Sequence, residues 1–86
     1  MKRIYIKAYN ELKKIGAPVF KEYSNGEPIE NGGFKISGES GCYELLDYEN
    51  YMMGEFGVSM EIIDVLTKYG LYPEWENAGC LNVWEA

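Results

Sequence analysis

The chain has 86 residues, of which 47% are hydrophobic and 15% aromatic, and its formal net charge is −6 at neutral pH. This length fits a single domain, residues 1–86, without a deep two-lobed active site, and the apolar content is too high for a disordered chain. The sequence contains no histidine, which removes the usual general base and the commonest zinc ligand, so we expect no enzyme, no metal site and no cofactor.

The charges are divided unequally along the chain. Residues 1–38 carry a net charge of +3, whereas residues 39–86 carry −9, with ten of the fourteen carboxylates and a single basic residue, Lys68. The acidic balance disfavours nucleic acid as a partner. This asymmetry bears on partners and association rates rather than on the fold.

Residues 4–15 are predicted to form an amphipathic helix. Apolar residues recur along one stripe at spacings of three and four: Tyr5, Ala8, Tyr9, Leu12 and Ile15. Such a stripe is typical of a helix that packs on a core. Gly16 suits the left-handed residue after a helix, and Pro18 prevents the helix from resuming.

Two alternating segments, residues 19–23 and 34–38, are predicted to pair as strands of one hairpin. The turn signal Ser24-Asn25-Gly26 and the pair Gly32-Gly33 lie between them. We therefore expect a wide connecting loop.

Residues 42–52 fit two patterns. Alternation favours a strand as far as Tyr48, whereas Leu45, Tyr48 and Met52 would also form a helical stripe. Ser59 then suits the N-cap of a second helix over residues 60–69, with its hydroxyl accepting a hydrogen bond from the first turn. Gly70 suits the end of that helix.

Residues 71–85 are predicted to form a second hairpin around Asn77-Ala78-Gly79, and Pro73 places its first strand at an edge of the sheet. The elements together predict a small α+β domain, with two helices packed on an antiparallel sheet of about four to five strands. The start of the chain lacks the apolar run of a signal peptide or membrane span, so we expect a cytoplasmic protein.

The motifs that carry catalytic or ligand chemistry are not matched. Cys42 and Cys80 are too few for a disulfide framework and are expected to remain thiols. Ser40 lies in Gly38-Glu39-Ser40-Gly41, which lacks the second glycine of a nucleophile elbow. The carboxylates near Asp47 do not have the spacing of a calcium loop.

Aromatic and acidic residues alternate in two segments of the second half. This alternation is expected wherever a strand has one buried and one solvated face, and it also fits an interface in which Tyr and Trp act as anchors and carboxylates attract a basic partner. The predicted protein-binding residues are Glu44, Asp47, Tyr48, Glu49 and Tyr51 in the first patch, and Glu74, Trp75 and Glu76 in the second.

The last third of the chain contains, in this order, Phe56-Gly57-Val58, Tyr69-Gly70-Leu71-Tyr72, Glu74-Trp75, Gly79, Leu81-Asn82-Val83 and Glu85-Ala86. In this order of residues it resembles small uncharacterised proteins of bacteriophages and mobile elements. The resemblance implies a context rather than an activity, because small acidic proteins of such elements often inhibit host defence or nucleic-acid-handling proteins, some of them as DNA mimics.

The leading hypothesis is a non-enzymatic acidic binding module, an inhibitor or adaptor that docks on a basic protein surface. The alternative is a small nucleic-acid-associated protein that uses the basic N-terminal helix. That helix contributes Lys2, Arg3, Lys7, Lys13 and Lys14. A homodimer, in which the basic half of one copy meets the acidic half of the other, is also compatible with the charges.

Overall fold

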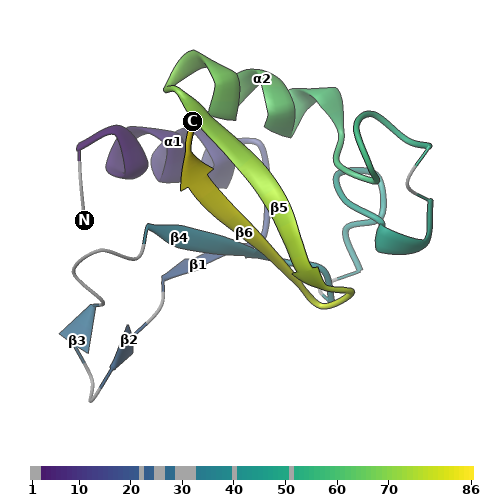
Figure 1. The fold of residues 1–86 in the computed structure, drawn as a ribbon, viewed down its shortest axis with the longest axis horizontal. Helices are drawn as coiled ribbons and strands as arrows, with labels where there is room; N and C mark the ends of the chain where they lie inside the picture. Colours follow the sequence, from purple (N-terminus) through teal and green to yellow (C-terminus); the bar gives the residue numbers. More distant parts are fainter. Residues whose placement is uncertain (1–2, 22, 25–26, 29–32, 40, 51) are drawn as a thin grey trace.

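The computed structural model of the chain describes residues 3–21, 23–24, 27–28, 33–39, 41–50 and 52–86. In chain order the elements are α1 (Arg3–Lys14), β1 (Val19–Lys21), β2 (Tyr23–Ser24), β3 (Glu27–Pro28), β4 (Phe34–Ser37), the 3-10 helix η1 (Tyr48–Asn50), α2 (Met60–Lys68), β5 (Leu71–Asn77) and β6 (Cys80–Glu85). Two helices and a four-stranded antiparallel sheet form a small α+β domain, which confirms the predicted fold class (Figure 1).

The sheet has the strand order β1-β4-β6-β5, and all neighbours are antiparallel. Both predicted hairpins are therefore present, and they join through β4 and β6, where Ile36 lies opposite Leu81. The strand β5 is at an edge, as Pro73 indicated, because a residue without an N–H group is tolerated there. The predicted wide loop contains a separate small ribbon, β2 paired with β3.

Both helices cover the same face of the sheet, and the core lies between the two layers (Figure 1). The sheet contributes Phe34, Ile36, Leu71, Leu81 and Val83 to this core, and the helices contribute Tyr5, Ala8, Leu12, Ile62, Ile63 and Leu66. Neither helix covers the opposite face of the sheet, which we call the uncovered face and which carries the alternate residues of each strand.

The end of α1 follows from its local sequence. Gly16 has φ +86°, a left-handed conformation that glycine adopts without a Cβ clash. The N–H groups of Gly16 and Ala17 donate to the carbonyls of Lys13 and Leu12 at 3.2 and 2.9 Å, the paired bonds of a Schellman motif. The predicted termination of the helix is thus confirmed.

The strand predicted as far as Tyr48 is wrong. Leu46 makes one isolated bridge, with Val58, and the chain then enters η1. The Cys42 carbonyl accepts hydrogen bonds from the N–H groups of both Leu45 and Leu46, each at 3.0 Å, so this segment is a tight turn. Its pairing partner is the short stretch that leads into α2, which is too brief to support a full strand.

The prediction for Ser59 is half correct. Ser59 occupies the N-cap of α2, and its carbonyl accepts hydrogen bonds from the N–H groups of Ile62 and Ile63 at 3.1 Å. Its hydroxyl, however, makes no capping bond and is buried without a partner. The Ser59 N–H instead ties the helix start to the Leu45 carbonyl at 2.8 Å.

No helix among the described residues is long and apolar enough to cross a membrane. Cys42 and Cys80 are half-buried and are not joined by a disulfide.

Candidate protein-interaction surface

The two predicted binding patches meet at one aromatic contact. Tyr48 of η1 and Trp75 of β5 pack edge to face, with ring centroids 5.3 Å apart and an interplanar angle of 87°. Such aromatic pairs contribute beyond the area they bury. The contact therefore fixes the loop of residues 41–50 against the β5–β6 hairpin and places the first patch beside the second.

An open hollow with a volume of about 530 Å³ lies where this loop meets the hairpin. Its lining residues, which we call the acidic hollow, are Gly38, Glu39, Tyr43, Asp47, Tyr48, Glu49 and Ala78. No lysine or arginine is found among these described lining residues. Tyr43 and Tyr48 are 62% and 47% exposed, so both rings remain available to a partner.

Only part of the first patch lines the acidic hollow. Asp47, Tyr48 and Glu49 do, whereas Glu44 is exposed outside it, and Tyr51 lies outside the described residues. Asp47 also has a structural role, because its Oδ1 accepts a hydrogen bond from the Glu49 N–H at 3.2 Å. Such a local bond favours the turn that starts η1.

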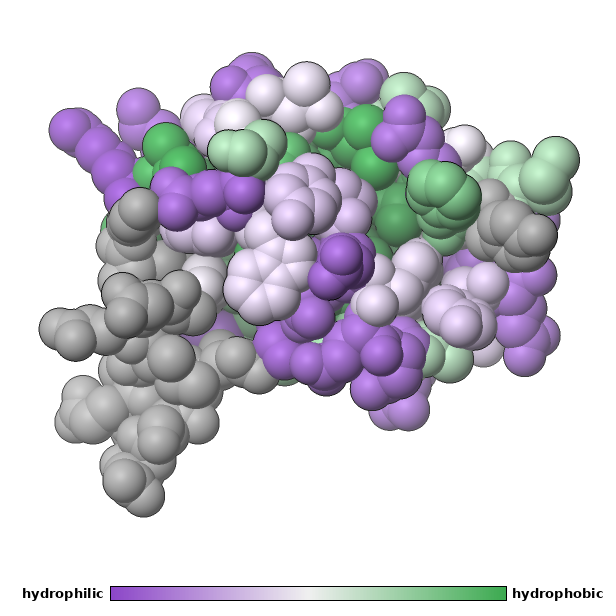
Figure 2. Space-filling view, in the orientation of Figure 1, coloured by the Kyte–Doolittle hydropathy of each residue, from purple (hydrophilic) through white to green (hydrophobic). Residues whose placement is uncertain are grey.

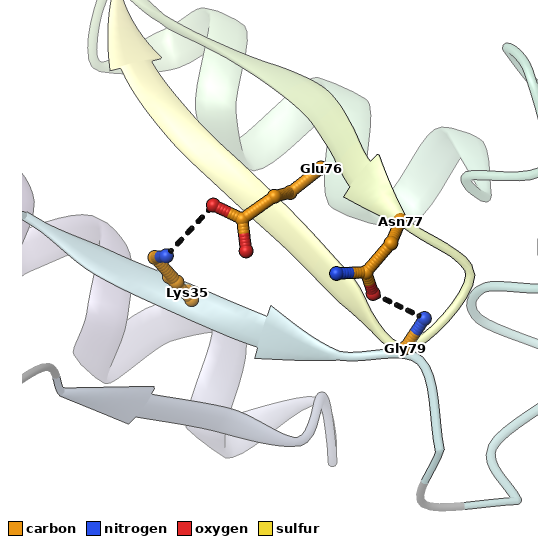
Figure 3. A network of polar contacts seen from close by, with 4 residues as sticks. All are labelled: Lys35, Glu76, Asn77 and Gly79. Atoms are coloured by element: carbon orange, nitrogen blue, oxygen red, sulfur yellow. Dashed lines mark hydrogen bonds and ion pairs between the residues drawn. The ribbon is translucent and has the colours of Figure 1, made fainter.

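The second patch is divided between the two faces of the sheet. Trp75 lies opposite Leu81 and packs against the core, and its Nε1–H donates to the carbonyl of the exposed Phe56 at 2.7 Å. Because side chains alternate along a strand, Glu74 and Glu76 lie on the uncovered face. There, Glu76 forms an ion pair with Lys35 at 3.3 Å (Figure 3). Trp75 is therefore a half-buried link between loop and sheet rather than an exposed anchor.

A second depression, of about 500 Å³, runs beside the edge strand β5. We call it the apolar groove, and its lining residues are Glu55, Phe56, Val58, Ile63, Tyr72, Pro73, Glu74, Trp75 and Leu81. Figure 2 shows hydrophobic surface between β5 and the loop before α2, with hydrophilic residues over the hairpin below it. Trp75 belongs to the apolar groove, and its ring partner Tyr48 belongs to the acidic hollow, so the two depressions adjoin.

Phe56 was not among the predicted binding residues, and neither were Glu39 and Tyr43 of the acidic hollow. Glu55 and Val58 exchange two backbone hydrogen bonds, of 2.9 and 3.0 Å, around Phe56 and Gly57. These central residues have φ of 51° and 83°, which is the pattern of a type I′ turn. Asn or Gly normally occupies the first of these positions, and a bulky residue costs about 1–2 kcal/mol there. The pair Phe56-Gly57 does not by its residue types predict a type I′ turn, because the favoured pairs are Asn-Gly, Asp-Gly and Gly-Gly.

Helix α1 carries Arg3, Lys7, Lys13 and Lys14, and none of them lines either depression. Arg3, Lys7 and Lys14 are exposed, and their spacing places them on one stripe of the helix. Lys13 lies 5.9 Å from the centroid of the Tyr9 ring, a cation–π distance. Of the predicted basic set, Lys2 falls outside the described residues.

One carboxylate of α1 joins the two helices. Glu11 Oε1 accepts hydrogen bonds from Lys68 Nζ at 2.5 Å and from the Tyr69 hydroxyl at 2.6 Å. The hydrogen bond from Lys68, followed by that from Tyr69, holds the pKa of Glu11 below its usual value. The same bonds to Glu11 raise the pKa values of Lys68 and Tyr69. This cluster is a structural clamp, and none of its three residues lines either depression.

Metal ions in proteins are held by sets of several donor side chains. No group of three Asp, Glu or Cys residues in the described part of the chain lies close enough together to hold a metal ion.

Asn82, 7% exposed, has a buried Oδ1 without a hydrogen-bond partner on the uncovered face of the sheet. It lies beside Lys35, Glu76 and Trp84 around a small cavity of about 100 Å³.

The comparisons with known proteins give no assignment. No protein-family model, no curated protein and no solved structure matches the chain.

Proposed function

We propose that the protein is a non-enzymatic acidic binding module, an inhibitor or adaptor that docks on a basic protein surface. The observation that carries this proposal is the contact between Tyr48 and Trp75, which joins the acidic hollow to the sheet. Exposed tyrosine rings among carboxylates, with no basic residue in the lining, suit a partner that presents Lys and Arg.

The division of charge along the molecule supports the same proposal. Helix α1, which carries the basic stripe, and the turn between β5 and β6, where Ala78 lines the acidic hollow, lie on different sides of the fold (Figure 1). A charged region of this kind attracts an oppositely charged surface during diffusion and speeds the encounter at low salt.

The context that we propose is that of a cytoplasmic accessory protein of a bacteriophage or mobile element, of the anti-defence type. In such a protein the carboxylates of the acidic hollow would occupy the place of DNA phosphates on a nucleic-acid-binding partner. Displacement of the partner's DNA by the protein is the measurement that tests this DNA-mimic form of the proposal.

Charge reversal in the acidic hollow tests the binding function. We expect Glu39→Lys/Glu49→Lys to slow association with a captured partner on the order of tenfold at about 0.05 M salt, with a smaller effect at about 0.5 M. Asp47 is left unchanged because its side chain supports η1. The partner is first captured from a cell lysate and identified, and association is then measured with the purified proteins.

The matched control places the same charges elsewhere. Glu61→Lys/Asp64→Lys alters two exposed carboxylates of α2, and each double variant has a net charge of −2 in place of −6. Equal loss of binding in both variants would mean that net charge alone attracts the partner. Unchanged binding in the variant of the acidic hollow would refute the proposed surface.

Nucleic-acid association through α1 is a second candidate, favoured by the exposed stripe of Arg3, Lys7 and Lys14. It predicts that DNA or RNA is retarded in a gel at low salt, that retardation fades steeply as salt rises, and that Lys7→Glu/Lys14→Glu abolishes it. The leading proposal predicts no retardation with the unaltered protein.

A further inference from the structure

The apolar groove differs from the acidic hollow in that most of the residues lining it are hydrophobic. Its apolar lining comes from three elements: Phe56 and Val58 from the turn before α2, Ile63 from α2, and Pro73 and Trp75 from β5. Glu55 and Glu74 are its only charged lining residues in the described part of the chain, and both are exposed. The groove therefore combines an apolar interior with negative charge at its margin.

Phe56 is held in an unfavourable conformation without compensation from burial. Its φ is 51°, yet its side chain is 71% exposed, so the ring gains little from packing within this chain. A strained backbone that persists at an exposed aromatic residue is characteristic of functional sites. The strain is explained if the type I′ turn presents the ring to a partner.

The edge of β5 favours recognition by side chains over addition of a strand. The Ala86 N–H donates to the Gly70 carbonyl at 2.9 Å, so by alternation the backbone groups of Leu71, Pro73 and Trp75 point outward. Pro73 has no N–H and removes the central donor from this row. A partner strand would therefore lack a hydrogen bond in the middle of its ladder.

We infer that the apolar groove binds a protein segment in which an apolar side chain is flanked by lysine or arginine. The apolar side chain packs between Phe56 and Trp75, and the flanking cations pair with Glu55 and Glu74. Charge complementarity selects this occupant, because negative charge surrounds the groove and no described lining residue is basic. The inference rests on the proposed binding function and names the chemistry of the partner.

The test uses a random peptide display library selected on the intact protein. We expect the selected peptides to combine an apolar residue with adjacent Lys or Arg. Synthetic versions should bind Phe56→Asn at least about tenfold more weakly, as for removal of a central aromatic anchor. Asn suits the type I′ position, so this variant keeps the turn.

Two further variants separate the components of the site. Glu55→Gln/Glu74→Gln should weaken the same peptides and reduce the salt dependence of their affinity. Met52→Asn changes another exposed apolar residue, 85% exposed and outside the groove, and should leave affinity unchanged.

The inference fails if no peptide is selected, if the peptides lack either component, or if Phe56→Asn binds them as the unaltered protein does. It also fails if Phe56→Asn abolishes self-association, because a second copy would then be the occupant. If Phe56→Asn retains a basic protein partner that Glu39→Lys/Glu49→Lys loses, the proposed function stands without this groove. If both variants retain it, both proposals fail.

Discussion

The carboxylate of Glu11, in α1, accepts hydrogen bonds from Lys68 and Tyr69 at the end of α2 and so links the two helices through their side chains. Its pKa is lowered in the folded protein, so its contribution to stability is present above its usual value of 4.5 and is lost as pH falls through the lowered pKa. Lys68 and Tyr69 have raised pKa values, so their contributions are present below 10.5 and 10.0 and are lost as pH rises through the raised values.

The substitution Glu11→Gln tests this contribution to stability, because it removes the negative charge of the side chain and retains its shape. We expect a lower melting temperature than that of the unaltered protein between about pH 5 and pH 9.5, because the charged hydrogen bonds are fully present throughout that window. The difference should shrink in acid, where Glu11 itself becomes neutral. Thermal unfolding followed by circular dichroism across pH measures it, and a constant difference at every pH would contradict the clamp.

Phe56 permits a prediction that needs no partner. Phe56→Asn should stabilise the protein by about 1 kcal/mol, because Asn tolerates the left-handed conformation that Phe resists. For a domain of this size the melting temperature should rise by roughly 4–8 °C. Met52→Asn, at an exposed position without a positive φ, serves as the control. A lower melting temperature for Phe56→Asn would show that its ring supports the fold.

The turn of residues 54–58 requires glycine at position 54 for two reasons: the backbone there has a positive φ, and the neighbouring chain leaves no room for a side chain. Gly54 and Gly41 both have positive φ, of 53° and 82°. A Cβ at Gly54 would lie 2.0 Å from the Val58 carbonyl oxygen, whereas nothing lies within 4 Å of a Cβ at Gly41. The two glycines therefore form a matched pair.

We expect Gly41→Ala to cost about 1 kcal/mol, through the left-handed backbone alone. Gly54→Ala should cost more than about 3 kcal/mol, because backbone atoms must move to relieve the clash. Chemical denaturation measures both values. Similar costs would mean that the turn beside the apolar groove readily rearranges.

The sequence predicted the elements whose signals are local. The end of α1 at Gly16 and the hairpin around Asn77-Ala78-Gly79 depend on neighbouring residues, and both are confirmed. Residues 42–48 were predicted as a strand because alternation is visible in sequence, whereas the absence of an adjacent strand to pair with is not. The pairing of Ile36 with Leu81 likewise depends on contacts between distant segments.

The same distinction applies to the candidate surface. Composition indicated two acidic and aromatic patches, but only the three-dimensional contact of Tyr48 with Trp75 shows that they adjoin. Strand alternation places Trp75 and its acidic neighbours on different faces of the sheet, so the second predicted patch is not one continuous surface. Phe56 was missed because its φ is not encoded in a pattern that residue types reveal.

The whole molecule measures 34 × 26 × 22 Å, and the basic helix α1 and the acidic hollow are separate parts of its surface. Two copies related by a two-fold axis can place each basic α1 against the partner's acidic hollow. If this pairing occurs, sedimentation velocity should detect dimers at about 0.02 M salt and monomers at about 0.3 M, where the charges are screened. Identical sedimentation at both salt concentrations would exclude a dimer formed through these charges.

The hydrogen bond from the Ala86 N–H to the Gly70 carbonyl fastens the end of β6 beside the end of α2. Ala78, which lines the acidic hollow, lies at the opposite end of that strand, about 20 Å away for six residues. A biotin or fusion tag attached after Ala86 would therefore hold the protein on a sensor surface with its acidic hollow directed away from the support.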